Sequence, residues 1–233
     1  MSIEAIFLGL DGVLFDTEPL HLAACNGAFA EADLSIRWTL PALRAAAQTH
    51  GYARAIGTAI ACEPLARDKA RVARLFELKH SLFQQAVTAQ PPQASASALS
   101  LIVDALEAGC KLAVLTDLPA PVASLLLEQC FGADVNSLFT VVGGGVSFEG
   151  PSGTGPYARA LHAMGIDPAT AVAVDTAAPS LRAAQECGLW TVSVAPFGDI
   201  VRPQQFITFD ALRDARSPFS ASPRREIGAG RAA

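Results

Sequence analysis

Several residues able to bind an anion fall at the ends of apolar runs along the chain. Asp11 and Gly12 follow the apolar residues 6–10, and Thr116 and Asp117 close another apolar run. In open α/β folds, ligands bind at the carboxyl ends of the strands, where a tight loop presents backbone N–H groups. We therefore expect this loop and the Thr116 hydroxyl to bind a phosphate-like anion weakly, against repulsion from the nearby carboxylates.

Each of these residues also has a purely structural interpretation. Asp11 can hydrogen-bond within the turn that it shares with Gly12, as Asp often does. Thr116 can bond to the backbone at the end of its strand, and Asp16 or Thr17 can cap the helix expected to start there. The sequence leaves both interpretations open for Asp11 and Thr116.

The elements that position these residues alternate between strands and helices. Apolar, β-branched runs predict strands at residues 3–10, 111–116, 139–143, 171–175 and 191–194. Periodic patterns predict helices at residues 95–108, 119–130, 156–164 and 179–187. Strands that are apolar along their whole length are covered on both faces, and strand–helix alternation produces right-handed crossovers. The fold class is therefore α/β, with a parallel sheet.

A long helical segment separates the first strand from the rest of the sheet. Its pattern is helical almost throughout, and it closes at Pro91-Pro92. The last residues of the chain are polar, small and rich in Arg. We predict a core formed by residues 1–15 and 91–216, a helical cap domain at 16–90 and a loose C-terminal tail at 217–233.

Composition excludes several classes of protein. The 233 residues are 51% hydrophobic and 17% charged, enough for a sizeable core. The net charge is −5 and no basic stripe carries aromatic residues, so we expect no nucleic-acid partner. Neither a signal peptide nor a membrane-spanning apolar run is evident, so we expect a cytoplasmic protein without membrane contact. The five cysteines form no C-x-x-C pair, and we expect small, mostly buried hydrophobic side chains.

The first apolar run continues into a longer motif, because residues 6–18 read I-F-L-G-L-D-G-V-L-F-D-T-E. This segment resembles the first motif of the haloacid dehalogenase-like superfamily, D-x-D-G-x-x-x-D-[ST]. The resemblance continues through the helical insertion, and it is especially close to the helical-cap sugar-phosphate phosphatases and phosphoglucomutases. Within these, the xylulose-bisphosphate phosphatases look nearest. The resemblance implies a Rossmann-like parallel sheet core with an inserted α-helical cap domain.

The resemblance also implies a mechanism that passes through a covalent aspartyl-phosphate. In the family, the leading Asp of the motif attacks phosphorus, and the Asp two residues later, here Asp11, is the general acid and base. A hydroxyl after the second strand, here Thr116, binds the phosphoryl oxygens. A Lys offsets the charge of the nucleophile and the phosphate, and acids after the fourth strand hold Mg²⁺.

Three of the family's four motifs have lost a key group in this chain. The nucleophile position is Gly9, and the Lys position falls on Pro151. After the fourth strand, Asp175 takes the first position of the motif and Thr176 takes the metal-binding Asp. The Asp175 carboxylate and the backbone carbonyl of Asp11 supply too few oxygens for Mg²⁺.

The insertion carries further candidates by the same resemblance. In the xylulose-bisphosphate phosphatases a G-G-K-x-R loop and a later helical Lys contact the substrate phosphate; here the loop reads H-G-Y-A-R, which keeps Arg54, and Lys79 fits the helical Lys. Glu18 and His21 lie one helical turn apart, where family members face the active site. For these four we favour solvated surface over a role in the site. The candidate ligand-binding residues are Gly12, Glu18, His21, Arg54, Lys79 and Asp117, the last at a position where Asn is common.

These losses predict a catalytically impaired pseudo-phosphatase, with Asp11 and Thr116 as residual catalytic positions. Its expected ligand is a small phosphorylated metabolite or another anion, with no cofactor, and a protein partner is compatible with the sequence. One alternative is an active Mg²⁺-dependent phosphatase that acts on a small sugar phosphate through substituted residues. A second alternative is a protein-interaction subunit. Mg²⁺ is expected only in the active form, held by the Asp11 backbone and by Asp175.

Overall fold

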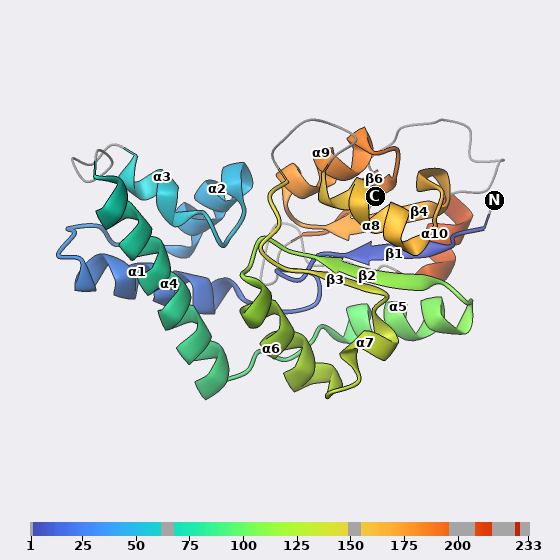
Figure 1. Ribbon diagram of the computed structural model, residues 1–233, viewed down its shortest axis with the longest axis horizontal. Coiled ribbons are helices and arrows are strands. Elements are labelled where there is room, and N and C mark those ends of the chain that lie inside the picture. The colour runs from blue at the N-terminus through green and yellow to red at the C-terminus, as the bar shows by residue number, and fades with distance from the viewer. Residues whose placement is uncertain (1, 62–67, 149–154, 196–207, 216–226, 229–233) are drawn as a thin grey trace, which may run out of the picture.

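A parallel sheet forms the centre of the protein (Figure 1). The structure, a computed structural model, describes residues 2–61, 68–148, 155–195, 208–215 and 227–228. The strands are β1 (Ala5–Leu8), β2 (Lys111–Leu115), β3 (Val141–Gly143), β4 (Ala171–Asp175), β5 (Trp190–Ser193) and β6 (Ile227–Gly228). They pair in the order β3-β2-β1-β4-β5-β6, and every pair is parallel. The strand order has a switch point between β1 and β4: β2 and β3 follow on one side of β1, and β4, β5 and β6 on the other. In such sheets, ligands bind beyond the carboxyl ends of the strands at the switch point.

Helices cover both faces of the sheet. Those that follow the insertion are α5 (Ala96–Glu107), α6 (Ala120–Phe131), α7 (Val135–Leu138), α8 (Pro156–Met164), α9 (Ala178–Glu186) and α10 (Phe209–Ala215), with a 3₁₀ turn at Pro168–Thr170. Pro156 and Pro179 lie in the first turns of α8 and α9, where a missing N–H leaves no bond unmade. A left-handed Gly165 follows α8.

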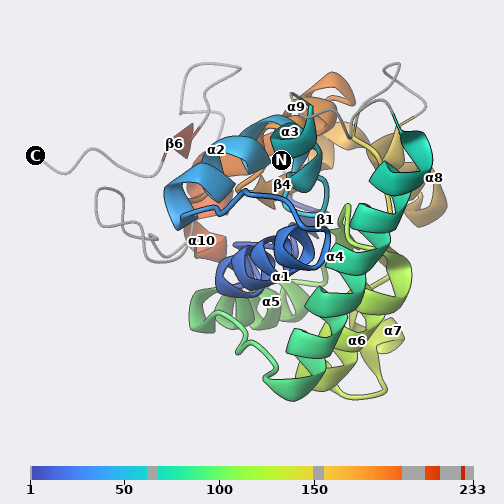
Figure 2. The ribbon, with the colours of Figure 1, turned by 90° about the vertical axis from the view of Figure 1, so that its left-hand side faces the viewer.

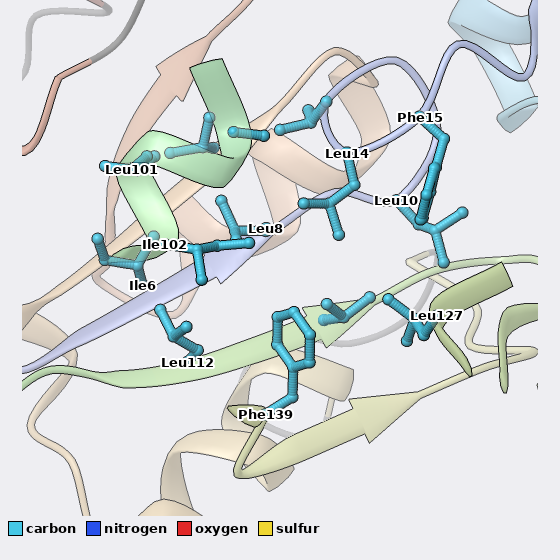
Figure 3. Packing of buried hydrophobic residues seen from close by; sticks show 14 of the residues in the cluster. Ile6, Leu8, Leu10, Leu14, Phe15, Leu101, Ile102, Leu112, Leu127 and Phe139 are labelled. Carbon is cyan, nitrogen blue, oxygen red and sulfur yellow. The ribbon is translucent and has the colours of Figure 1, made fainter. Parts of the chain in front are cut away.

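Two hydrophobic clusters fill the space between the sheet and its helices. Figure 3 shows the first, in which Ile6 and Leu8 of β1 pack with Leu101 and Ile102 of α5. On the opposite face, the second cluster joins β1 and β4 to α8 and α9. The β1 and β4 side chains are buried without exception, because both faces of the sheet are covered.

Four helices between β1 and the rest of the core lie together beyond one end of the sheet (Figure 1), the end that faces the viewer in Figure 2. They are α1 (Glu18–Glu31), α2 (Leu40–His50), α3 (Ile56–Ile60) and α4 (Lys69–Ala89). A third cluster, with Phe29, Leu43 and Ile56, packs them against each other. Phe83 and Val87 of α4 belong instead to the first cluster of the core, so α4 is anchored in both.

The predicted elements agree with the observed ones in type, with shifts at their ends. The first strand is shorter than predicted at both ends, and at its C-terminal end the chain turns after Gly9 into the loop that carries Asp11. Within the predicted C-terminal tail, β6 pairs with β5. The prediction for the cysteines is wrong at Cys130, which is exposed near the end of α6, and Cys62 lies outside the described residues.

The described helices include one of 21 residues, α4, which carries several charges. No helix in the described part of the chain is long and apolar enough to cross a membrane.

Candidate functional site

A pocket lies at the carboxyl ends of β1, β2 and β4, where the core meets the helices of the insertion. Its volume is about 40 Å³. It is lined by Leu10, Asp11, Gly51, Tyr52, Arg54, Leu115, Thr116, Asp117, Val146, Ser147, Phe148, Asp175, Thr176, Ala177 and Pro179. Of the predicted site residues, Asp11, Arg54, Thr116 and Asp117 therefore meet at one pocket. Gly12, Glu18, His21 and Lys79 do not line it.

The Asp175 carboxylate lies where a side chain at position 9 would begin. A Cβ atom on Gly9 would lie 2.7 Å from both Cγ and Oδ1 of Asp175, which is closer than real Cβ contacts come. The carboxylate is fixed there because Oδ1 accepts hydrogen bonds from the backbone N–H groups of Thr176 and Ala177, at 2.7 and 3.0 Å. Burial raises the pKa of Asp175 to about 6. The space beside Gly9 is thus filled by a carboxylate from the neighbouring strand.

Asp11 is buried and held by two side chains of the insertion. Its Oδ1 accepts a hydrogen bond from Thr17 Oγ1 at 2.5 Å and lies 3.1 Å from His21 Nε2. Burial acts to raise the pKa of Asp11, but the hydrogen bonds from His21 and Thr17, with the charge of Lys79, outweigh burial and lower it. Asp11 is therefore ionised, and it is bound to side chains rather than only capping its own turn. Thr17 stands at the N-cap of α1 but uses its hydroxyl for Asp11.

A buried polar chain continues from Asp11 through His21 to Lys79. Lys79 Nζ lies 3.0 Å from His21 Nδ1 and donates to the carbonyls of Tyr52 and Ala53, each at 3.3 Å. Burial, reinforced by the charge of Lys79, lowers the pKa of His21 to about 4. Neutral His21 accepts from Lys79 at Nδ1 and donates from Nε2 to Asp11. The expectation of solvated surface is wrong for His21 and Lys79, since both are fully buried.

Glu18 is also buried, and here too the expectation of solvated surface is wrong. Arg44 donates to both of its carboxylate oxygens, from Nε at 3.0 Å and from Nη2 at 2.6 Å, and the Tyr52 hydroxyl donates to Oε1. Neither Arg44 nor Tyr52 was predicted to belong to the site. The only indication was that Arg44 is a basic residue within the predicted helical segment. Arg54, by contrast, is exposed as expected, and its Nη1 donates to Ser147 at 3.3 Å.

Thr116 and Asp117 follow β2 but differ in their partners. Thr116 accepts from the backbone N–H of Leu118 at 3.2 Å, which is the structural role foreseen for it, although it also lines the pocket. Asp117 Oδ2 is buried and has no hydrogen-bond partner among the described residues. It lies against Gly51, whose φ of +80° and lack of a side chain permit the approach. Burial, followed by the charge of Asp11, raises the pKa of Asp117 to about 7.

The residues present do not fit a Mg²⁺ ion. Thr176, at the metal-binding position, donates its hydroxyl to the backbone carbonyl of Asp11 at 3.2 Å, and its methyl group fills the space beside Gly12. Asp175 Oδ1 is already bonded to two backbone N–H groups. The described residues contain no group of three acidic, His or Cys side chains able to hold a metal, whereas Mg²⁺ requires near-octahedral oxygen ligands. Pro151, at the expected Lys position, lies outside the described residues.

Comparison with known proteins extends over almost the whole chain. No family model matches it. Protein CbbY of Cereibacter sphaeroides is 30% identical over 215 residues, which cover 91% of this chain and 92% of the relative. The chain belongs to the CbbY family. The predicted resemblance to haloacid dehalogenase-like sugar-phosphate phosphatases is thereby confirmed.

Solved CbbY structures agree with this assignment. CbbY of Rhodobacter sphaeroides in complex with xylulose-(1,5)bisphosphate is 29% identical, has a TM-score of 0.71 and covers 84% of this chain and 87% of its own. The same protein in complex with phosphate is 27% identical, has a TM-score of 0.70 and covers 92% and 96%. The α/β fold with a parallel sheet is confirmed by both the sheet and these CbbY structures.

Proposed function

We propose that this chain is a catalytically impaired member of the CbbY family that binds a small ligand and does not turn over phosphoesters efficiently. The observation that carries the proposal is the Asp175 carboxylate beside Gly9, in the space that a nucleophile at position 9 would need. Asp175 is held there by two backbone N–H groups, so it does not yield that space freely.

The missing nucleophile argues most strongly against turnover. Loss of a covalent nucleophile lowers the rate by several orders of magnitude in well-studied hydrolases. The second argument is charge: Asp11, Asp117 and Asp175 line the pocket, while the one basic side chain among its described lining residues is Arg54. An anionic transition state needs cations or donors aimed at it.

The test is a phosphatase assay on the purified chain with Mg²⁺. The substrates are xylulose bisphosphate, other sugar phosphates and a generic aryl phosphate, since CbbY structures hold xylulose bisphosphate or phosphate. We expect rates no higher than those of the Asp11→Ala variant prepared in parallel. Turnover well above background that Asp11→Ala abolishes would overturn the proposal.

The alternative of an active phosphatase with substituted residues rests on the environment of Asp11. Its carboxylate is ionised and held by Thr17 and His21, as a general base would be. The same assay decides between the two, because an active enzyme would lose its turnover in Asp11→Ala. A small phosphorylated ligand, a protein partner and a cytoplasmic location remain predictions.

A further inference from the structure

The helical insertion has a surface hollow of its own, between α1 and α4. These two helices pack against each other (Figure 2), and the hollow opens where the C-terminal end of α1 meets the first half of α4. Its volume is about 440 Å³, within the range of sites for small organic ligands. Its described lining includes Glu31, Asp33, Arg71, Arg74, Leu75 and Leu78, none of which lines the pocket at the strand ends.

The two sides of this α1–α4 hollow carry opposite charges. Arg71 and Arg74 lie three residues apart on α4, so their side chains leave the same face of the helix. Glu31, the last residue of α1, and Asp33, two residues beyond it, supply two carboxylates from the other side. All four side chains are exposed, and none makes a hydrogen bond or an ion pair with a residue that the structure describes. A ligand that reaches both sides can supply the partners.

Asp33 has a backbone conformation that favours glycine. Its φ is +54°, the one positive φ of a non-glycine residue in the described part of the chain. Gly is the usual residue at such a position after a helix, because a Cβ atom is unfavourable in the left-handed region, and Asp is among the few alternatives. No described residue hydrogen-bonds to the Asp33 carboxylate to offset this cost. Position 33 thus carries a carboxylate at the rim of the hollow whose partner is not in the described chain.

The hollow also has an apolar part, which narrows the class of ligand. Leu75 and Leu78 each lie one helical turn beyond an arginine of the same face, and Leu75 is buried. A guanidinium group binds a carboxylate through paired N–H groups, and an ammonium group donates to carboxylates. A phosphate would be attracted by the arginines but repelled by the acids opposite. The ligand that matches all three parts has a carboxylate, an ammonium group and an aliphatic body.

We propose that the α1–α4 hollow binds a small aliphatic zwitterion, an amino acid or a short peptide. The carboxylate binds to the arginine pair of α4, the ammonium group binds to Glu31 and Asp33, and the aliphatic part lies on Leu75 and Leu78. Exposed ion pairs contribute little each, so the dissociation constant is about 1–10 mM. This site goes beyond the proposed function and does not depend on whether the chain turns over phosphoesters.

The test is an NMR titration of the full chain with leucine and with leucyl-leucine at about pH 6.5, where their ammonium groups are protonated. The backbone amides of Ala32, Asp33 and Leu75 should show saturable shifts, and the tighter of the two probes identifies the ligand as an amino acid or a peptide. N-acetyl-leucyl-leucine lacks the ammonium group and leucyl-leucinamide lacks the carboxylate. Each should bind about fivefold more weakly than leucyl-leucine, since each loses one set of ion pairs.

Charge variants test which side binds which group. In Arg71→Gln/Arg74→Gln, leucyl-leucinamide should bind at least as tightly as leucyl-leucine, because the carboxylate no longer has a partner. In Glu31→Gln/Asp33→Asn, N-acetyl-leucyl-leucine should do so, and Asn tolerates the backbone conformation at position 33. Arg182→Gln, at an exposed arginine of α9 outside the hollow, should change neither preference. A general loss of structure would weaken all the probes together and would not exchange their order.

Four results would overturn the proposal. They are a titration of the wild type that does not saturate, equal binding of leucyl-leucine and its two blocked forms, shifts confined to residues outside the hollow, and tighter binding of inorganic phosphate than of either zwitterion. The last would make the hollow an anion site. None of these results depends on turnover, so the phosphatase assay can support impaired catalysis while this inference fails, and the reverse also holds.

Discussion

Position 9 and position 175 depend on each other. Gly9 leaves open the space that Asp175 fills from the neighbouring strand, and no side chain fits at position 9 while Asp175 stays where it is. The sequence identified the loss at Gly9, because a motif fixes that position. It did not identify where the Asp175 carboxylate would lie, since this depends on the pairing of β1 with β4 and on the N–H groups at the start of α9.

We predict that Gly9→Ala lowers the free energy of unfolding by about 1–3 kcal/mol, as overpacking of a tight site does. Adding Asp175→Ser should recover part of the loss that Gly9→Ala causes, because the overlapping group is gone. Urea unfolding of the four proteins of this cycle measures the coupling. Gly155→Ala is the comparison, since a Cβ there meets nothing within 4 Å and the change costs only the difference between Gly and Ala at the N-cap of α8. Additive effects at positions 9 and 175 would contradict the interpretation.

Gly9→Asp should have no phosphatase activity in the assay described above, because Asp175 already fills the space beside position 9.

Asp117 should make the folded state less stable as the pH rises. Its folded pKa of about 7 lies above the ordinary value of 3.8, so the folded state keeps a proton that the unfolded state has lost. Stability therefore falls as the pH rises from about 4 through 7. Asp11, Asp175, Lys79 and Arg54 act on this carboxyl, and burial acts most strongly.

In Asp117→Asn this dependence should weaken. The variant should exceed wild type by about 1–3 kcal/mol at pH 8 and by much less at pH 5, because the wild-type carboxyl is protonated there. Chemical unfolding at the two pH values measures the difference. Asp175, whose pKa is also raised, is present in both proteins, so the contribution of its own burial is common to them. An equal difference at both pH values would show that ionisation of Asp117 is not the cause.

At the scale of elements, the pattern of the sequence predicted helices and their apolar stripes but not the polar residues that they bury. The apolar stripe of α4 indicated a long amphipathic helix, and the structure has one. The same pattern assigns Lys79 and His21 to solvent, because isolated charged or polar groups are rarely buried. They are buried since each satisfies the other across α1 and α4, a contact between residues far apart in the chain.

Lys79→Met should lower the free energy of unfolding by about 3 kcal/mol, because it leaves His21 and two carbonyls without a donor. The pKa of His21 should rise from about 4, because the Lys79 charge that helps to depress it is removed. NMR titration of the histidine side chains reads this shift, which lost packing alone would not produce. Lys69→Met is the control, an exposed lysine at the start of the same helix. An unchanged His21 pKa would refute the proposed pairing.

At the scale of the whole molecule, the sequence predicted a parallel sheet interrupted by a helical segment. It did not predict the strand order, because strands that are apolar on both faces carry no pattern that selects their neighbours. Nor did it predict how the helical segment joins the core. That junction has an apolar part, since Phe83 and Val87 of α4 and Ala24 of α1 belong to the same cluster as Ile6 and Leu112. It also has a polar part, the contact of Asp11 with Thr17 and His21.

A shared cluster should make the helical segment and the core unfold together. The two tryptophans of the chain report on the two parts: Trp38 packs edge-on against Phe29 among the helices, and Trp190 lies in β5. We predict that Trp38→Phe and Trp190→Phe variants, each with one tryptophan left, give the same denaturant midpoint once corrected for the cost of each substitution. Phe83→Ala should lower both midpoints by the equivalent of about 3–5 kcal/mol, because the cavity lies in the shared cluster. Ile56→Ala, confined to the cluster of the helices, is the comparison for a loss on one side only. If the Trp38 signal melted well before the Trp190 signal in otherwise unmodified protein, the two parts would be separate cooperative units, and the cluster around Phe83 would not join them.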